Sequence, residues 1–293
     1  MQEGLREMGY TERAPFLMQP WITSLYVDCP PNLVFDASPN ETLRCPTTEE
    51  VHRYEDAIRR GDIVFNAVPF NLQPEAMSPG LFEGSMEMVR MLCRRYNMSD
   101  DECGTVLSGR DVPGLSRGIL PLLKKHGVKG ISVGTNGCVE PSFPWDGENI
   151  QSMQPFVWRD NASDAEIVAV WEQGYGPGEV KSRRNVQVLP SGHALAFQFM
   201  SDNSGSTSSV SEVLQYYQSL RNAFPGARVV PSSLDKFYTE AAKVKDQLSV
   251  KVTGEVGDVW IQGMQRVPML YSAILCILAS THTTLLVLCR YWL

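Results

Sequence analysis

Four acidic side chains stand just beyond segments that the sequence predicts to be strands. They are Asp111, Asp202, Glu255 and Asp258. The carboxyl ends of the strands in a parallel barrel meet at one mouth, so these side chains would converge there. Hydrolysis of a glycosidic bond requires two carboxylates across a cleft, one as nucleophile or base and one as proton donor. We therefore take Asp111, Asp202 and Glu255 as candidate catalytic residues.

Asp111 is the first of these candidates because of the segment around it. The apolar residues Val106 and Leu107 predict a buried strand before it, and the spacing over 115–126 predicts a helix after it. A second strand follows at 128–133, which completes a parallel crossover unit with Asp111 at the carboxyl end of its first strand. The alternative is that the carboxylate only caps the helix that begins near Gly114.

Amide, carboxylate and aromatic side chains near other strand ends are candidates for binding sugar hydroxyls or a sugar face. We assign this role to Asn66, Asn71, Asn203, Asp258 and Trp260. Two alternatives stay open, because Asp202 and Asn203 are also typical of a turn and Trp260 could be a core residue.

Several functional classes lack their sequence signatures. Neither a dinucleotide fingerprint nor a phosphate-binding loop is present. The letters Gly130-Ile-Ser-Val-Gly134 match a serine-hydrolase elbow, but Ser132 is predicted inside a strand rather than on a turn into a helix. The seven cysteines include no C-x-x-C pair, although Cys29, Cys45, Cys93 and Cys103 could pair locally. The net charge of −7 and the absence of a basic run argue against a nucleic-acid partner.

Helical and strand-like segments alternate along the chain, which indicates an α/β protein with a mostly parallel sheet. The predicted helices are 48–60, 82–96, 115–126, 210–224 and a helix from a Ser233 cap to Val244. The seven strand candidates are 62–70, 104–108, 128–133, 166–171, 194–199, 228–230 and 248–253, with Trp21 and Tyr26 marking an earlier strand. Seven candidates favour a parallel β/α barrel over a doubly wound sheet. We place it at residues 1–263, followed by an apolar tail at 264–293.

The two ends of the sequence bear on localisation, which stays unassigned. The first ten residues have no apolar stretch, so we expect no cleavable secretion signal there. Three N-x-Ser/Thr triplets, at Asn40, Asn97 and Asn161, would matter only in the secretory pathway. Residues 267–289 contain no Asp, Glu, Lys or Arg, which is long enough for a membrane helix. A buried helix is the alternative.

Five segments carry a resemblance to a known family. They are 21–31, 60–71, 110–114, 201–205 and 253–260, in order along the chain. Together they resemble the domain-of-unknown-function family numbered 5054, which is similar to glycoside hydrolase family 38, the α-mannosidases, in the glycoside hydrolase/deacetylase barrel superfamily. The resemblance covers about residues 21–263.

This resemblance implies α-mannosidase-like chemistry, with a strand-end aspartate as both nucleophile and zinc ligand; Asp111 occupies that place. It also implies zinc ligands from a His-x-Asp motif on the first barrel strand, and this sequence contains no such motif. Phe65-Asn66 stands where relatives have Trp-His. The barrel is therefore expected to be incomplete at its N-terminal strand, and the zinc site incomplete. Two interpretations follow. The first is a carbohydrate-active hydrolase, active or inactive. The second is a truncated non-catalytic protein that binds carbohydrate or a partner, with the tail as a membrane anchor.

Overall fold

The computed structural model describes residues 1–30, 44–111, 115–135, 153–172, 180, 186–197, 207 and 209–256. Its α-helices are α1 (Gln2–Glu7), α2 (Pro20–Val27), α3 (Thr48–Arg59), α4 (Pro79–Arg95), α5 (Leu120–Lys125), α6 (Val210–Ala223) and α7 (Leu234–Lys243). Short 3-10 helices are η1 (Pro74–Ala76), η2 (Arg117–Ile119) and η4 (Lys245–Gln247).

The strands among these residues form three sheets. They are β1 (Phe16–Met18), β2 (Ile63–Phe65), β3 (Val106–Asp111), β4 (Gly130–Thr135), β5 (Phe156–Asp160), β6 (Ala165–Glu172), β7 (Gln187–Val188), β8 (Ala194–Leu195) and β9 (Lys251–Val252). The largest sheet has the order β3-β4-β6-β5-β9, while β1 pairs with β2 in parallel and β7 with β8 antiparallel. The segment after β2 continues alongside β3, because the Ala67 N–H donates to the Val106 carbonyl at 2.9 Å.

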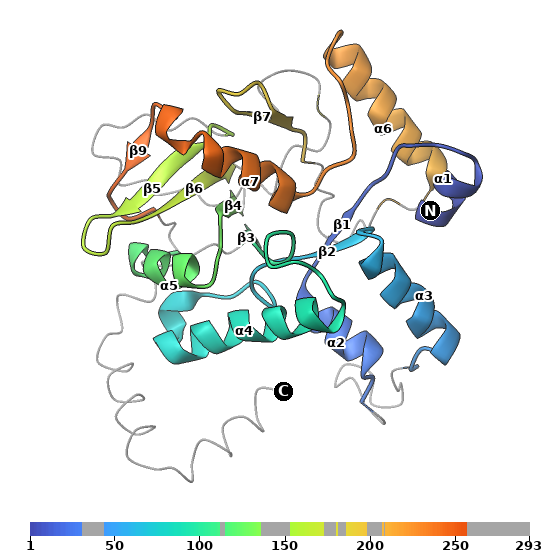
Figure 1. Cartoon of the computed structure of the whole chain (residues 1–293), viewed down its shortest axis with the longest axis horizontal. Coiled ribbons are helices and arrows are strands. Elements are labelled where there is room, and N and C mark those ends of the chain that lie inside the picture. The colour runs from blue at the N-terminus through green and yellow to red at the C-terminus, as the bar shows by residue number, and fades with distance from the viewer. Residues whose placement is uncertain are drawn as a thin grey trace.

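The large sheet lies between two layers of helices (Figure 1). On one face, Leu107, Ile131 and Trp171 pack with side chains of α4 and α5. On the other face, Val106 and Val168 pack with α7. Neighbouring residues of a strand therefore contribute to opposite layers, as the pleat of a strand requires.

Side-chain caps fix the starts of several predicted helices. Thr47 and Glu50 form a complete capping box at the start of α3. Ser78, Ser209 and Ser233 each accept a backbone N–H in the first turn of α4, α6 and α7. The helix predicted from the Ser233 cap is confirmed.

The α/β class and the mainly parallel sheet are confirmed, but the described residues show no closed barrel. β5 was not predicted, and it runs antiparallel to β6. Only four residues, 161–164, separate these two strands; that permits a hairpin, whereas a parallel neighbour requires a long crossover. β9 pairs with β5 and so also runs against β6.

Two strand predictions are wrong. Trp21 and Tyr26 lie in α2, where Pro20 occupies the first turn with its backbone angle already suited to a helix. Residues 228–230 belong to no strand. The strands predicted at 62–70, 194–199 and 248–253 are present but much shorter.

Two disulfides join the four cysteines named above. Cys29 pairs with Cys45, and Cys93 at the end of α4 pairs with Cys103 before β3. Both members of the second pair are fully buried, so that bond ties α4 to the start of the central sheet.

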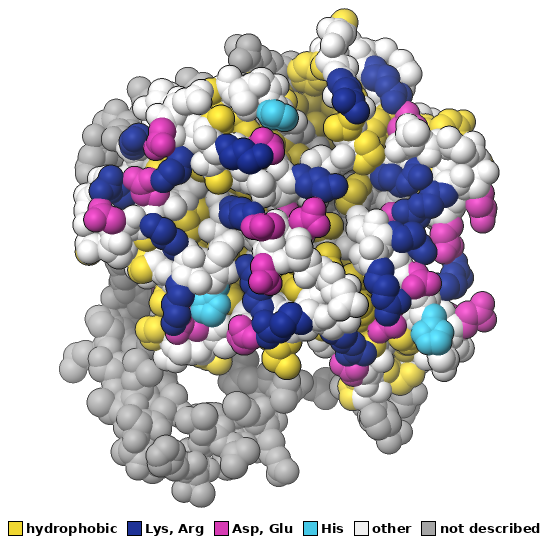
Figure 2. Space-filling view, viewed as in Figure 1, with side chains coloured by type: hydrophobic (Ala, Val, Ile, Leu, Met, Phe, Trp, Pro, Cys, Tyr) yellow, Lys and Arg dark blue, Asp and Glu magenta, His cyan; other side chains and the backbone are white. Residues whose placement is uncertain are grey.

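Figure 2 shows both basic and acidic side chains over the face in view. No helix within the described ranges has the length and apolar character to cross a membrane. The predicted membrane segment, 267–289, lies outside those ranges, as does the proposed domain boundary at 263–264.

Candidate active site

Asp111 is the last residue of β3 and lies opposite Thr135 of β4 in the parallel register. Its backbone φ is 77°, in the left-handed region that residues with a Cβ rarely adopt. Such conformations cost about 1–3 kcal/mol and are concentrated at functional sites. The carboxyl end of a parallel strand is also where α/β sheets carry their ligand-binding groups.

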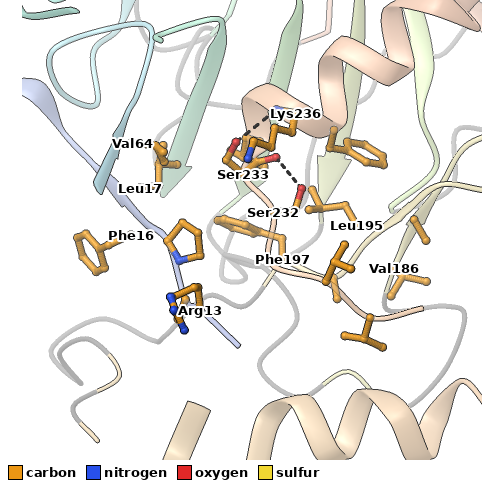
Figure 3. Close-up of a pocket in the computed structure, with 18 of the residues that line it drawn as sticks. Arg13, Phe16, Leu17, Val64, Val186, Leu195, Phe197, Ser232, Ser233 and Lys236 are labelled. Carbon is orange, nitrogen blue, oxygen red and sulfur yellow. Dashed lines mark hydrogen bonds between the residues drawn. The ribbon is translucent and has the colours of Figure 1, made fainter. Parts of the chain in front are cut away.

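Asp111 is among the residues that line a cavity of about 1600 Å³. The walls come from β1, β2 and β3 and from β8, α6 and α7. In Figure 3, Leu17 and Val64 stand across from Leu195 and Val186, with Phe197 between them. Most of the residues labelled in Figure 3 are therefore apolar.

Polar groups gather in this cavity at the carboxyl end of β3. Asn71, Ser108, Arg110 and Asp111 all line it there. Apolar walls with a few polar groups at one place are typical of small-molecule binding sites.

Arg110 and Glu172 are both buried beside this polar end. Glu172 closes β6, and its side chain accepts a hydrogen bond from Gln187 at 2.7 Å. The Arg110 guanidinium donates to the carbonyl and the hydroxyl of Ser132 and lies 4.8 Å from the centre of the Phe197 ring. Burial raises the pKa of Glu172 and lowers the pKa of Arg110, and the attraction between the two charges opposes both shifts.

The sequence alone assigns no role to Arg110 or Glu172. The sequence signal for Arg110 is its position two residues after Ser108, which places both side chains on one face of β3. The alternation of side chains along one strand does not predict which charged residues of different strands lie close together.

The amides of Asn66 and Asn71 bind the backbone of β3. Asn66 is fully buried; it accepts from the Ser108 N–H and donates to the Ser108 carbonyl, both at 2.8 Å. Asn71 repeats this arrangement at Arg110, with distances of 3.1 and 2.5 Å. The two side chains thus take the place of a neighbouring strand's peptide groups. Asn71 lines the cavity, whereas Asn66 does not.

Glu255 lies in a different environment from Asp111. Its carboxylate accepts from the Arg117 N–H at 2.5 Å, and the Arg117 Nε lies 3.3 Å from Asp160 and 3.9 Å from Glu255. Burial raises the pKa of the neighbouring Glu75, and the charge of Glu255 raises it further. Glu255 is not among the described residues that line the cavity, so its catalytic role stays a prediction.

Four of the predicted site residues, Asp202, Asn203, Asp258 and Trp260, lie outside the described residues. Their roles stay predictions.

The described residues around Asp111 do not fit a zinc ion. A catalytic zinc site usually takes three protein ligands, and no three His, Cys, Asp or Glu side chains in the described ranges gather at one point. The residue next to Asp111, Arg110, is a buried cation rather than a ligand. Zinc therefore remains a prediction that metal analysis must test.

No protein-family model matches the chain, and no curated protein matches it. Among solved structures, the chain is similar to an alpha-mannosidase from Enterococcus faecalis V583, with 13% identity and a TM-score of 0.49 over 71% of this chain and 24% of that one. It is also similar to a protein in glycosyl hydrolase family 38 from Enterococcus faecalis, with 12% identity and a TM-score of 0.40 over 71% of this chain and 22% of that one. The chain spans about a quarter of the length of these structures. Neither likeness assigns an activity to the chain.

Proposed function

We propose that this chain is a carbohydrate-active hydrolase of the glycosidase type, with Asp111 as its catalytic nucleophile. The observation that carries the proposal is the position of Asp111, at the carboxyl end of β3, in a left-handed backbone conformation and on a cavity wall. The motif resemblance given above adds the expectation that the sugar is an α-mannoside.

The chemistry follows from the general scheme for retaining glycosidases. The Asp111 carboxylate attacks the anomeric carbon while the bond from that carbon to the leaving oxygen breaks. A second carboxyl group protonates the leaving oxygen, and the same group later takes a proton from the water that releases the sugar. Asp202 is the predicted second carboxyl group, because Glu255 already binds Arg117 and lies away from the cavity lining.

Two polar groups near Asp111 have positioning roles in this proposal. The amide of Asn71 holds the backbone at Arg110, one residue before the nucleophile. The Arg110 guanidinium holds β3 to β4 through its hydrogen bonds to Ser132. These contacts fix the end of the strand from which Asp111 projects, and a fixed nucleophile is what a catalytic site requires.

The second candidate function is carbohydrate or partner binding without catalysis. It is favoured by the position of Glu255, which is not among the described residues that line the cavity with Asp111. On this interpretation the cavity still takes a sugar, but the chain does not catalyse its hydrolysis.

The deciding experiment combines hydrolysis and binding on the same purified chain. Release of nitrophenol from aryl α-mannosides is measured with and without added zinc, and mannoside binding is measured by calorimetry. Hydrolysis that is lost in Asp111→Asn supports the enzyme. Binding without hydrolysis supports the second candidate, and neither signal with any aryl glycoside contradicts both.

Asp111→Asn suits this test because asparagine tolerates the left-handed conformation. Asp164 provides a matched control, since it also has positive φ, at 54°, but lies exposed in the β5–β6 turn. Asp164→Asn makes the same chemical change in the same backbone region, so it should leave hydrolysis unchanged.

A further inference from the structure

The pairing of its cysteines indicates that this chain folds under oxidising conditions. Cys29 and Cys45 are joined with their Cα atoms 5.7 Å apart, and Cys93 and Cys103 with theirs 6.0 Å apart. Stable disulfides form in secreted proteins and in the secretory pathway, and they are rare where thiols are kept reduced. The secretory pathway is also where N-x-Ser/Thr triplets receive glycans.

Two of the three triplets lie within the described residues, and both are on the surface. They are Asn97-Met-Ser99, after α4, and Asn161-Ala-Ser163, in the β5–β6 turn. Asn97, Ser99, Asn161 and Ser163 are all exposed. The third triplet, at Asn40, lies outside the described residues.

Asn97 ends α4 through its backbone rather than through its side chain. Its backbone has φ of 54°, and its N–H donates to the Arg94 carbonyl at 3.1 Å, which ends the helix. Its side-chain amide makes no hydrogen bond with any described residue. The triplet also falls inside the loop that the Cys93–Cys103 disulfide closes, so one short segment carries both a disulfide and a glycosylation triplet.

The turn around Asn161 is held by its neighbours rather than by the asparagine. The Asp160 carboxylate accepts from the Ala162 and Ser163 N–H groups at 3.4 and 3.0 Å and from the Ser163 hydroxyl at 2.5 Å. The Asn161 amide has no hydrogen-bond partner in the described part of the chain. A glycan on it would therefore displace no contact, in contrast to Asn66, whose amide is fully buried and bonded to β3.

We propose that Asn97 and Asn161 are sites of N-linked glycosylation. The donor is an oligosaccharide joined to a lipid through pyrophosphate, and the catalyst is the membrane-bound transferase of the secretory pathway. The side-chain nitrogen of asparagine forms a bond to the anomeric carbon of the first sugar. The bond from that carbon to the phosphate oxygen breaks, the lipid pyrophosphate leaves, and the amide loses one proton.

The test secretes the full chain from yeast behind an appended cleavable signal. The purified protein is treated with the glycosidase that releases N-glycans and converts the modified asparagine to aspartate, and its peptides are analysed by mass spectrometry. We expect Asp at positions 97 and 161. Asn97→Gln and Asn161→Gln should each remove one glycan, and the double variant should remove both.

Controls separate loss of the modification from loss of folding. Ser99→Thr and Ser163→Thr keep both the triplet and the hydroxyl, so these variants should remain glycosylated. Peptide mapping without reduction reports whether Cys93–Cys103 is intact in every variant. Recovery of unmodified Asn97 and Asn161 from secreted chain with intact disulfides would overturn the proposal, and modification at only one position would overturn it for the other.

Discussion

Replacement of Asn66 by alanine tests whether its buried amide stands in for a strand beside β3. The substitution leaves the N–H and the carbonyl of Ser108 without partners, and both Asn66 and Ser108 are buried. An unsatisfied buried polar group costs about 1–3 kcal/mol, so two such groups should lower the free energy of unfolding by about 2–6 kcal/mol. With a urea dependence of about 2–3 kcal/mol/M, the urea midpoint should fall by about 0.7–3 M.

Asn71→Ala is the matched control for this measurement. Asn71 makes the same pair of hydrogen bonds to Arg110, but its side chain is exposed. Water can replace the lost bonds there, so the loss should be about 0.5–1.5 kcal/mol. Urea unfolding followed by circular dichroism gives both values. Equal losses in the two variants would refute the argument from burial.

Two further predictions concern packing and pH. A Cβ added at Gly130 would lie 2.1 Å from the Tyr238 ring, so Gly130→Ala should lower the free energy of unfolding by about 2–3 kcal/mol. Gly84 is in an exposed part of α4, and a Cβ added there would have no neighbour within 4 Å. Gly84→Ala should therefore raise the free energy of unfolding by about 0.5–1 kcal/mol in the same urea assay. A similar change in stability for both glycine variants would contradict the packing argument. Burial raises the pKa of Asp235, which accepts two hydrogen bonds from Thr105, above its unfolded value. The protonated group therefore stabilises the fold at low pH, and this stability is lost as pH rises through the folded pKa. Unfolding measured upward from about pH 4 should show a steeper loss for the wild type than for Asp235→Asn; parallel curves would exclude this cause.

Local sequence signals predicted the parts of the fold that depend on local physics. The helix predicted at 48–60 corresponds to α3, and the predicted Ser233 cap marked the start of α7. The apolar run before Asp111 predicted β3. These predictions are correct because a helix cap or a buried strand requires particular residue types within a few positions of the sequence.

The wrong or missing predictions concern features that depend on contacts between distant parts of the chain. The composition of α2 suits a strand as well as a helix, and the direction of β5 depends on its short connection to β6. The same is true of the candidate site. The position of Asp111 followed from its own strand, whereas the contacts of Asn66 with β3 and of Glu255 with Arg117 join residues 42 and 138 positions apart. No local pattern encodes such pairs.

The most direct test of the account compares aryl α-mannoside hydrolysis by the wild-type chain, Asp111→Asn and the Asp164→Asn control. Loss of a carboxylate that takes part in the reaction typically lowers the rate by about 100- to 10,000-fold. We predict a fall in kcat of that size for Asp111→Asn and wild-type activity for Asp164→Asn. Activity in the wild type that persists unchanged in Asp111→Asn would contradict the assignment of Asp111 as the catalytic carboxylate.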